Sequence, residues 1–409
     1  MDDRTINILY LSYDGMTDPL GQSQVLPYLT RLSEKGFSFH LISFEKKEKF
    51  QNQKEKIQSI CDQAKIYWHP LSYTKKPPLL STVYDVQRMQ HFAINLHKKV
   101  NFSAVHCRSY IAALIGLKLK KKFNIPFLFD MRGFWADERV EGQIWSLSNP
   151  VFKLVYNYFK KKEKLFFLES SHIISLTESG KREIFKMLPV LQKDKVSVIP
   201  CCVDLSKFNP ELINLEDLQK LKVDLGIETT DKVLGYVGSI GTWYRLSEML
   251  DYYKVFCIYH PNSKFLFVTA ENDKLIKDLA IEKQISISNL IIKSCQHDEV
   301  PKFISLFDYS IFFILSTFSK TASSPTKLAE LMAMGIPVIC NSGVGDTEII
   351  INQNNAGSVI ESLNEAAFNE QLNVPLSYSK EQVIQSARAS FGVSTGVAIY
   401  ESAYHKILL

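Results

Sequence analysis

"SSPTKLAELMAMGIPVICNSGVGDTE", residues 323 to 348, joins a polar start, a helical run, a glycine stop and a short apolar strand. Ser323 or Ser324 suits a helix N-cap and Pro325 suits the first helical position, which predicts a helix that ends near Gly335. "IPVICNS" then has the composition of a buried strand, and a glycine turn follows it. A helix that leads directly into a buried strand is the repeating unit of a parallel α/β sheet.

The same alternation of short apolar runs and longer amphipathic stretches occurs in both halves of the chain. The first series runs from "INILYLSY" to "HIISLTE", and the second runs from "KVLGYVGSI" to "PVICNS". For 409 residues this predicts two Rossmann-like α/β domains, with parallel sheets that face an interdomain cleft at the carboxyl ends of their strands. We expect domains at residues 1–208 and 209–385, and a final helical segment, 386–409, that crosses back to the first domain.

The net charge of +5 is unevenly distributed. The first 200 residues hold 31 Lys and Arg against 19 Asp and Glu, and the remainder holds 17 against 24. Basic and aromatic residues alternate in "LKLKKKF" (117–123) and "YFKKKEKLFFLESS" (158–171). Such helices can lie on an anionic membrane, but they can equally bury one face against a sheet and leave their lysines in solvent. We expect no nucleic-acid partner.

Several signals for other protein classes are missing. The acidic start lacks the features of a signal peptide, no apolar run approaches the ~18 residues of a membrane span, and seven cysteines without CxxC spacing suggest reduced packing residues. We therefore expect a cytoplasmic protein. The sequence has no GxxxxGK[ST] loop, which argues against an NTPase, and it has no DxD metal motif.

The helix after Pro325 is the first candidate site. Its free N–H groups and dipole attract an anion, Lys327 adds a cation in the first turn, and Glu330 can accept hydrogen bonds from two ribose hydroxyls. An ordinary capped amphipathic helix with a surface Lys and Glu would give the same pattern.

"ELMAMGIPVICNSGVGDTE" resembles the second half of the E-x7-E motif of retaining GT-B glycosyltransferases of family 4. Glu330 matches the glutamate that holds the donor ribose in that family, whereas Ala322 stands at the first glutamate. "SSPTKLAE" is similar to a variant whose Ser, Thr and Lys line the sugar and phosphate site, which implies donor contacts from Ser323, Ser324, Thr326 and Lys327. The resemblance implies metal-independent transfer, without a cofactor, from a nucleotide diphosphate sugar to a glycan or lipid-linked acceptor, in bacterial surface polysaccharide synthesis.

The resemblance extends to the first half of the chain. "LSYDGMTDPLGQSQVLPYL" is similar to the family's opening glycine loop, which implies that Gly21 approaches the donor phosphate and Gln22 the acceptor; a plain turn glycine is the alternative. "GYVGSIGTWYRLSEML" (235–250) resembles the loop that grips the diphosphate, with Ser239 and Arg245 at the binding positions. Arg245 could equally be a solvated helix residue.

"FLFDMRGFWADERVEGQIW" (127–145) combines charged and aromatic residues in a loop after an apolar strand. Arg132 stands about where the family has a histidine and can stabilise diphosphate, and we predict catalytic roles for Asp130, Arg132 and Lys327. The acceptor would contact Trp135, Asp137, Glu138 and Arg139. The alternative is a structural ion pair, Asp130–Arg132 or Glu138–Arg139. His106, in "AVHCRSY", could be a core histidine satisfied by backbone.

Two other functions remain open at this level. A sugar-nucleotide 2-epimerase shares the fold, and a non-catalytic sugar-nucleotide-binding subunit would fit the missing first glutamate.

Overall fold

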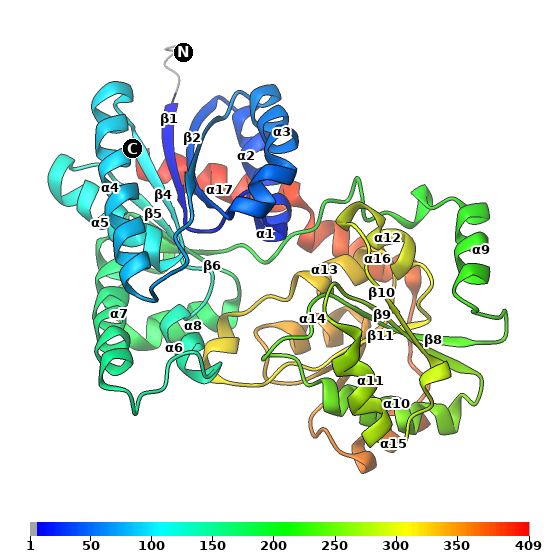
Figure 1. The fold of residues 1–409 in the computed structure, drawn as a ribbon. Coiled ribbons are helices and arrows are strands. Elements are labelled where there is room, and N and C mark those ends of the chain that lie inside the picture. Colours follow the sequence, from blue (N-terminus) through cyan, green and yellow to red (C-terminus); the bar gives the residue numbers. More distant parts are fainter. Residues whose placement is uncertain (1–5, 409) are drawn as a thin grey trace. The chain divides into compact units, whose positions relative to one another are not determined.

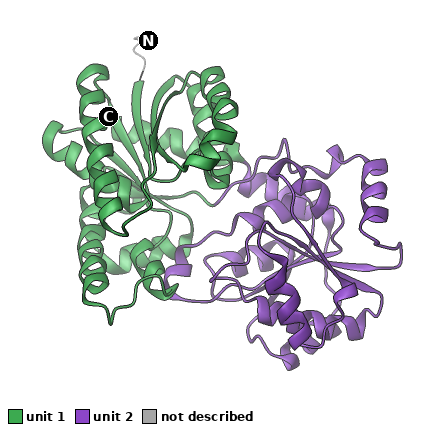
Figure 2. Ribbon diagram, viewed as in Figure 1, with its two compact units in different colours: residues 1–200, 393–409 green, residues 201–392 purple. Residues whose placement is uncertain are grey.

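The computed structural model describes residues 6–408 and divides the chain into two compact units. Unit 1 comprises residues 1–200 and 393–409, and unit 2 comprises residues 201–392 (Figure 2). The chain therefore passes between the units after Pro200 and after Gly392, compared with residues 208 and 385 in the sequence analysis.

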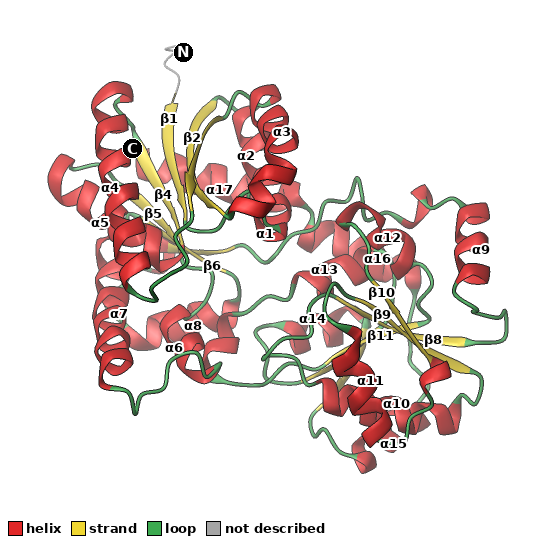
Figure 3. Cartoon of the chain, in the orientation of Figure 1, coloured by secondary structure: helices red, strands yellow, loops and turns green. Residues whose placement is uncertain are grey.

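Unit 1 contains a seven-stranded sheet in the order β3-β2-β1-β4-β5-β6-β7, in which every neighbouring pair is parallel (Figures 1 and 3). The strands are β1 (Ile6–Ser12), β2 (Phe37–Glu45), β3 (Tyr67–Ser72), β4 (Ala104–Arg108), β5 (Phe127–Asp130), β6 (His172–Ser175) and β7 (Val196–Val198). The helices are α1 (Pro19–Gln24), α2 (Leu26–Ser33), α3 (Lys47–Gln63), α4 (Leu80–Val100), α5 (Ser109–Phe123), α6 (Trp135–Glu141), α7 (Pro150–Glu169), α8 (Glu178–Met187), η1 (Lys193–Lys195) and α17 (Val393–Leu408).

The apolar runs of unit 1 become strands because helices bury them on both faces. Every residue of β4, β5 and β6 is buried, as the continuous apolar runs of a parallel sheet predict. Local signals set the helix boundaries. Asn149 caps α7 through its side chain, with Pro150 at the first position, and left-handed Asn101 and Asn124 end α4 and α5.

Unit 2 contains a six-stranded parallel sheet in the order β10-β9-β8-β11-β12-β13. Its strands are β8 (Lys232–Val237), β9 (Ser263–Val268), β10 (Leu290–Lys293), β11 (Tyr309–Phe312), β12 (Val338–Asn341) and β13 (Gly357–Ile360). Its helices are η2 (Pro210–Leu212), α9 (Leu215–Asp224), α10 (Leu246–Tyr259), α11 (Asp273–Glu282), η3 (Ile287–Asn289), η4 (His297–Glu299), α12 (Val300–Ile304), η5 (Phe318–Ala322), α13 (Thr326–Ala333), α14 (Thr347–Asn354), α15 (Glu365–Asn373) and α16 (Lys380–Phe391).

The end of the chain forms two helices that belong to different units. Helix α16 packs against α13 within unit 2. Gly392 is extended and separates it from α17, which packs against α2 and contacts β5 and β6 within unit 1. The last 17 residues therefore complete the first unit.

Candidate active site

Helix α13 begins one residue later than the sequence predicts. Pro325 is the N-cap rather than the first helical residue, and neither Ser323 nor Ser324 caps the helix. The Ser324 hydroxyl instead accepts a hydrogen bond from the Cys201 amide at 3.1 Å. Proline has no hydroxyl or carboxylate to accept from the first turn, so no side chain caps the N–H groups of α13. They remain suited to an anion.

Lys327 lies in the first turn of α13 and is only 5% exposed. Its Nζ has no hydrogen-bond partner. It lies 3.8 Å from the ring centre of Tyr244 and 4.1 Å from that of Tyr236. A Cβ on Gly238, which has a φ of +110°, would come within 3.2 Å of this nitrogen. Aromatic faces and bare backbone therefore surround the amine.

Burial lowers the pKa of Lys327 well below its usual value, and nearby Glu330 only partly opposes this effect. A buried ammonium without a hydrogen-bonded anion is costly, so a ligand with negative oxygens would satisfy this position. An uncapped helix start and a buried amine together favour phosphate over a neutral ligand.

Glu330 lies one turn further along α13, with its side chain 15% exposed. One carboxylate oxygen is 3.6 Å from the His297 ring, a contact too long for a strong hydrogen bond. The carboxylate therefore keeps the capacity to accept hydroxyl hydrogen bonds.

A second buried cation of unit 2 was missed by the sequence analysis. Lys320 lies in η5, and its Nζ is 3.6 Å from the ring centre of Trp243. Two adjacent aromatics, Trp243 and Tyr244, thus each lie against a lysine. The "TWY" triplet after the first strand of this unit was the available signal.

The residues of the loop after β8 that were predicted to bind the sugar donor, Ser239 and Arg245, have partners close by in the sequence. Arg245 occupies the N-cap position of α10 and is ion-paired with Glu248, with an Nε–Oε1 distance of 2.9 Å. Ser239 is exposed, and its carbonyl accepts a hydrogen bond from Tyr236. Their donor contacts stay predictions, as do those of Ser323, Ser324 and Thr326.

In unit 1, the sheet register brings Arg108 and Asp130 side by side at the carboxyl ends of β4 and β5. Asp130 is completely buried, and its Oδ2 accepts a hydrogen bond from the Tyr400 hydroxyl at 3.0 Å. Burial alone would raise the pKa of Asp130, but Arg132, His106 and Arg108 together lower it to about 2. The carboxylate is a fixed negative charge within reach of two guanidiniums.

Arg132 lies 3.7 Å from Asp130, with its side chain 11% exposed. Its backbone is left-handed, with a φ of +58°, and Gly133 follows at +119°. Such backbone strain is frequent at functional sites. His106, for which a core histidine was one possible interpretation, is buried, and its Nδ1 lies 2.7 Å from the Tyr404 hydroxyl.

The predicted acceptor residues lie on a helix, α6, rather than in a loop. Asp137 is buried and accepts hydrogen bonds from Tyr156 at 2.8 Å and Lys160 at 2.7 Å. Trp135 packs in an aromatic cluster, and the Arg139 guanidinium lies 5.1 Å from its ring centre. These contacts support a structural role for Trp135 and Asp137. Glu138 is partly exposed, and all four acceptor assignments stay predictions.

The glycine loop after β1 is tightly packed. A Cβ on Gly21 would lie 2.3 Å from the Gly15 carbonyl oxygen, so close backbone packing alone requires this glycine. The Gln22 amide donates to the Thr17 carbonyl at 3.3 Å. The proposed ligand contacts of both residues are untested by this geometry.

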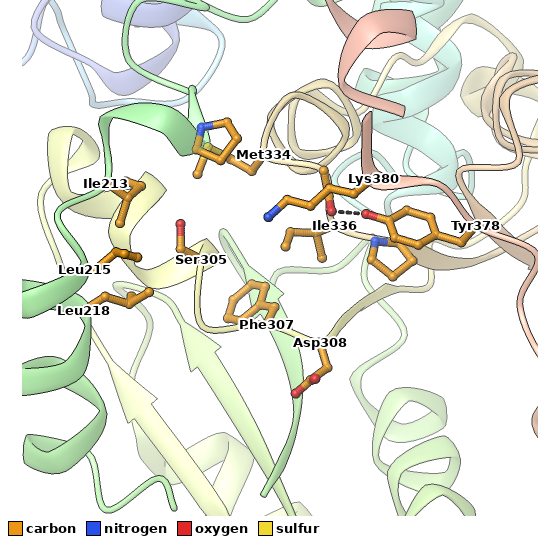
Figure 4. Close-up of a pocket in the computed structure, with 13 residues that line it drawn as sticks. Ile213, Leu215, Leu218, Ser305, Phe307, Asp308, Met334, Ile336, Tyr378 and Lys380 are labelled. Carbon is orange, nitrogen blue, oxygen red and sulfur yellow. Dashed lines mark hydrogen bonds between the residues drawn. The ribbon is translucent and has the colours of Figure 1, made fainter. Parts of the chain in front are cut away.

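A pocket of about 260 Å³ lies elsewhere in unit 2 (Figure 4). Its lining includes Phe307 and Ile336, which precede β11 and β12, together with Ile213, Leu215 and Tyr378. It therefore lies at the amino ends of these strands, whereas Gly238 and the α13 loop follow the carboxyl ends. None of the predicted site residues lines it.

Helix α7 exposes apolar and basic side chains together. Val151, Leu154, Tyr158 and Leu168 are exposed large hydrophobic residues, and Lys153, Lys161 and Lys164 are exposed beside them. Among the residues that the structure describes, no helix is long and apolar enough to cross a membrane.

Comparison with known proteins places the chain in a family. A model described as glycosyl transferases group 1 matches residues 217–389, and one described as glycosyltransferase family 4 matches residues 22–207. The alpha-monoglucosyldiacylglycerol synthase of Acholeplasma laidlawii is 20% identical over 248 residues, which are 59% of this chain and 59% of that protein. The match thus covers less than two thirds of this relative.

Solved structures extend the likeness over nearly the whole fold. HepE of Anabaena, in complex with UDP and glucose, has a TM-score of 0.69 at 12% identity and covers 98% of this chain and 99% of its own. The UDP-GlcNAc 2-epimerase of Neisseria meningitidis, bound to UDP-GlcNAc, has a TM-score of 0.59 at 12% identity, with 98% and 99% covered. At these identities the likeness concerns the fold alone. The two family models together span most of the sequence, and the chain belongs to the group 1 glycosyltransferases of the GT-B fold.

Proposed function

We propose that the protein transfers a sugar, with retention of anomeric configuration and without a metal ion, from a nucleotide diphosphate sugar to a hydroxyl of a glycan or glycolipid. The observation that carries this proposal is Lys327, a buried amine without a hydrogen-bond partner at the uncapped start of α13. Glu330, one turn further on, adds an acceptor for ribose hydroxyls. No cofactor is needed, since the sugar nucleotide is itself a substrate.

In the proposed mechanism, Lys327 and the first N–H groups of α13 stabilise charge on the departing diphosphate. For Arg132 of unit 1 we propose a catalytic role on the ground of its permanent positive charge, which lies 3.7 Å from the buried carboxylate of Asp130. The bond between the anomeric carbon and the diphosphate oxygen breaks as the acceptor oxygen forms its bond on the same face. The departing phosphate takes the acceptor proton, so no enzymatic nucleophile is required.

We further propose a cytoplasmic protein that docks at the inner face of the membrane through α7 and serves surface polysaccharide synthesis. The exposed apolar residues of α7 and the neighbouring lysines suit an anionic bilayer, and the curated relative's name is that of a lipid glucosyltransferase. Leu154→Asp should abolish co-sedimentation with phosphatidylglycerol vesicles, whereas Leu212→Asp on unit 2 should not. If the wild-type protein bound equally well to uncharged phosphatidylcholine vesicles, the proposed attraction of the α7 lysines to anionic lipid would be contradicted.

A donor screen tests the main proposal. UDP-, GDP- and ADP-sugars are incubated with the full chain and candidate acceptors, and release of the nucleoside diphosphate is measured. Acceptor-dependent release supports transfer. The fold likeness to an epimerase makes that activity the second candidate, and it would produce an epimeric sugar nucleotide without acceptor-dependent release. Binding without either reaction would indicate a non-catalytic subunit.

A further inference from the structure

Arg108 is the last residue of β4, and its side chain is 4% exposed. Its Nε and Nη1 are buried without a hydrogen-bond partner. The nearest carboxylates are Asp14, 3.5 Å from Nε, and Asp130, 3.8 Å from Nη1. Both distances exceed those of N–H···O hydrogen bonds, so the guanidinium is attracted to these groups without bonding either.

Unmade hydrogen bonds of this kind are costly. A buried donor without an acceptor has lost its hydrogen bonds to water and gained none in return, and Asp130 Oδ1 is a further buried atom without a hydrogen-bond partner at the same place. Three residues next to these strand ends have positive φ: Ser109 at +66°, Arg132 at +58° and Gly133 at +119°. Buried polar atoms without hydrogen-bond partners and residues of positive φ occur here together, which favours a ligand-binding site over a purely structural arrangement.

The charges indicate what the ligand carries. Asp130 lies between Arg108 and Arg132, and burial lowers the pKa of the neighbouring His106, an effect that Asp130 opposes. Asp14 is the partly exposed counter-charge of Arg108, with its side chain 50% exposed. Helix α5 begins at Ser109, so its positive end lies at the same point. An anion that displaced Asp14 would meet the Nε side of the guanidinium and this helix start.

We propose that Arg108 binds a phosphoryl group carried by the acceptor, and that Asp14 occupies this position until the acceptor arrives. A guanidinium suits phosphate because it can donate two parallel hydrogen bonds. This inference rests on the proposed transferase function, since only a transferase has an acceptor. It restricts the acceptor to phosphorylated glycans or phosphate-bearing lipids.

The test uses the full chain saturated with UDP, so that phosphate cannot enter the proposed donor site. Methyl phosphate is titrated by calorimetry into wild type, Arg108→Gln, Arg108→Lys and Asp14→Asn. Arg182→Gln, an exposed arginine of the same unit, is the matched control. We expect Arg108→Gln to weaken binding at least tenfold, Arg108→Lys to restore part of it, and the control to bind as wild type does.

The direction in which Asp14→Asn changes the affinity for methyl phosphate decides between the two explanations. Removal of a competing carboxylate should tighten methyl phosphate binding several-fold, whereas a purely structural ion pair predicts lower stability and no gain in affinity. Dihexanoyl phosphatidic acid, in a parallel titration, distinguishes a lipid phosphate from a sugar phosphate by the affinity that its acyl chains add.

Wild-type affinity in both Arg108→Gln and Asp14→Asn, or no methyl phosphate binding by any variant, would overturn the inference. Failure of the transferase proposal would appear separately, as a loss of UDP binding or of acceptor-dependent nucleotide release in wild type.

Discussion

The two units hold their cations of low solvent exposure in different ways. In unit 1, Arg108 and Arg132 lie near a buried carboxylate, Asp130. In unit 2, Lys320 and Lys327 lie against aromatic rings. A guanidinium keeps its proton in a protein, whereas a buried amine can lose it. Unit 1 therefore offers a permanent positive charge, and Lys327 of unit 2, whose pKa is lowered by burial, offers one that depends on pH and on a bound anion.

The largest expected effect comes from removing the permanent charge. Arg132→Ala should lower kcat by about 10²–10³-fold, because a preorganised charge acts mainly on the transition state. Donor affinity and the melting temperature should change little. Arg182→Ala is the control. A lower melting temperature with normal turnover in the folded fraction would identify a structural ion pair instead.

Removing the pH-dependent charge of Lys327 should weaken binding of the sugar donor. Lys327→Met should weaken binding of the nucleoside diphosphate by about 1.5–3 kcal/mol, the range for a lost hydrogen bond to a charged group, and leave nucleoside binding unchanged. Calorimetry with both ligands measures this difference, and Lys254→Met, on the exposed face of α10, serves as the control. Equal losses for the two ligands would remove the phosphate assignment.

Glu330 should act on the other end of the nucleotide. Glu330→Ala should weaken binding of both nucleoside and nucleoside diphosphate by about 1.5–3 kcal/mol, because the lost hydrogen bonds are those to ribose. The corresponding deoxyribose nucleotides should show no further loss in this variant. Unchanged affinity in a folded protein would rule out the ribose assignment.

The aromatic environment of Lys327 can be altered without touching the lysine. Tyr244→Leu should lower the affinity for nucleoside diphosphate by up to about 2 kcal/mol through the lost cation–π contact, whereas Tyr244→Phe, which keeps the ring, should bind like wild type. If both variants bind equally, the ring does not position the amine.

The smallest expected effect is a pH dependence of stability. Because burial lowers the pKa of Lys327, there is a pH range in which the unfolded chain holds a proton that the folded chain lacks. The free energy of unfolding, relative to Lys327→Met, should rise by at most about 1.4 kcal/mol per pH unit until the usual lysine pKa near ~10.4. Urea unfolding at several pH values checks the sign. A difference that falls with pH would contradict a buried neutral amine.

The sequence predicted the parallel α/β architecture because each apolar run carries its own signal. Contacts between distant segments were less accessible. Arg108, Asp130 and Tyr400 come from β4, β5 and α17, and only the strand register and the return of the chain to unit 1 bring them together. Likewise, nothing local indicates that Lys327 is buried against Tyr236 and Tyr244 rather than solvated.

Unit 2 is inserted within unit 1. The ribosome therefore makes the seven strands of unit 1 first, then all of unit 2, and only then α17, which packs against the first sheet. During translation, about 10–40 seconds pass while residues 201–392 are made. Throughout this time Asp130 and His106 lack the hydroxyls of Tyr400 and Tyr404. Until α17 is made, the nascent first unit therefore lacks two buried hydrogen bonds and the helix that packs against α2, β5 and β6.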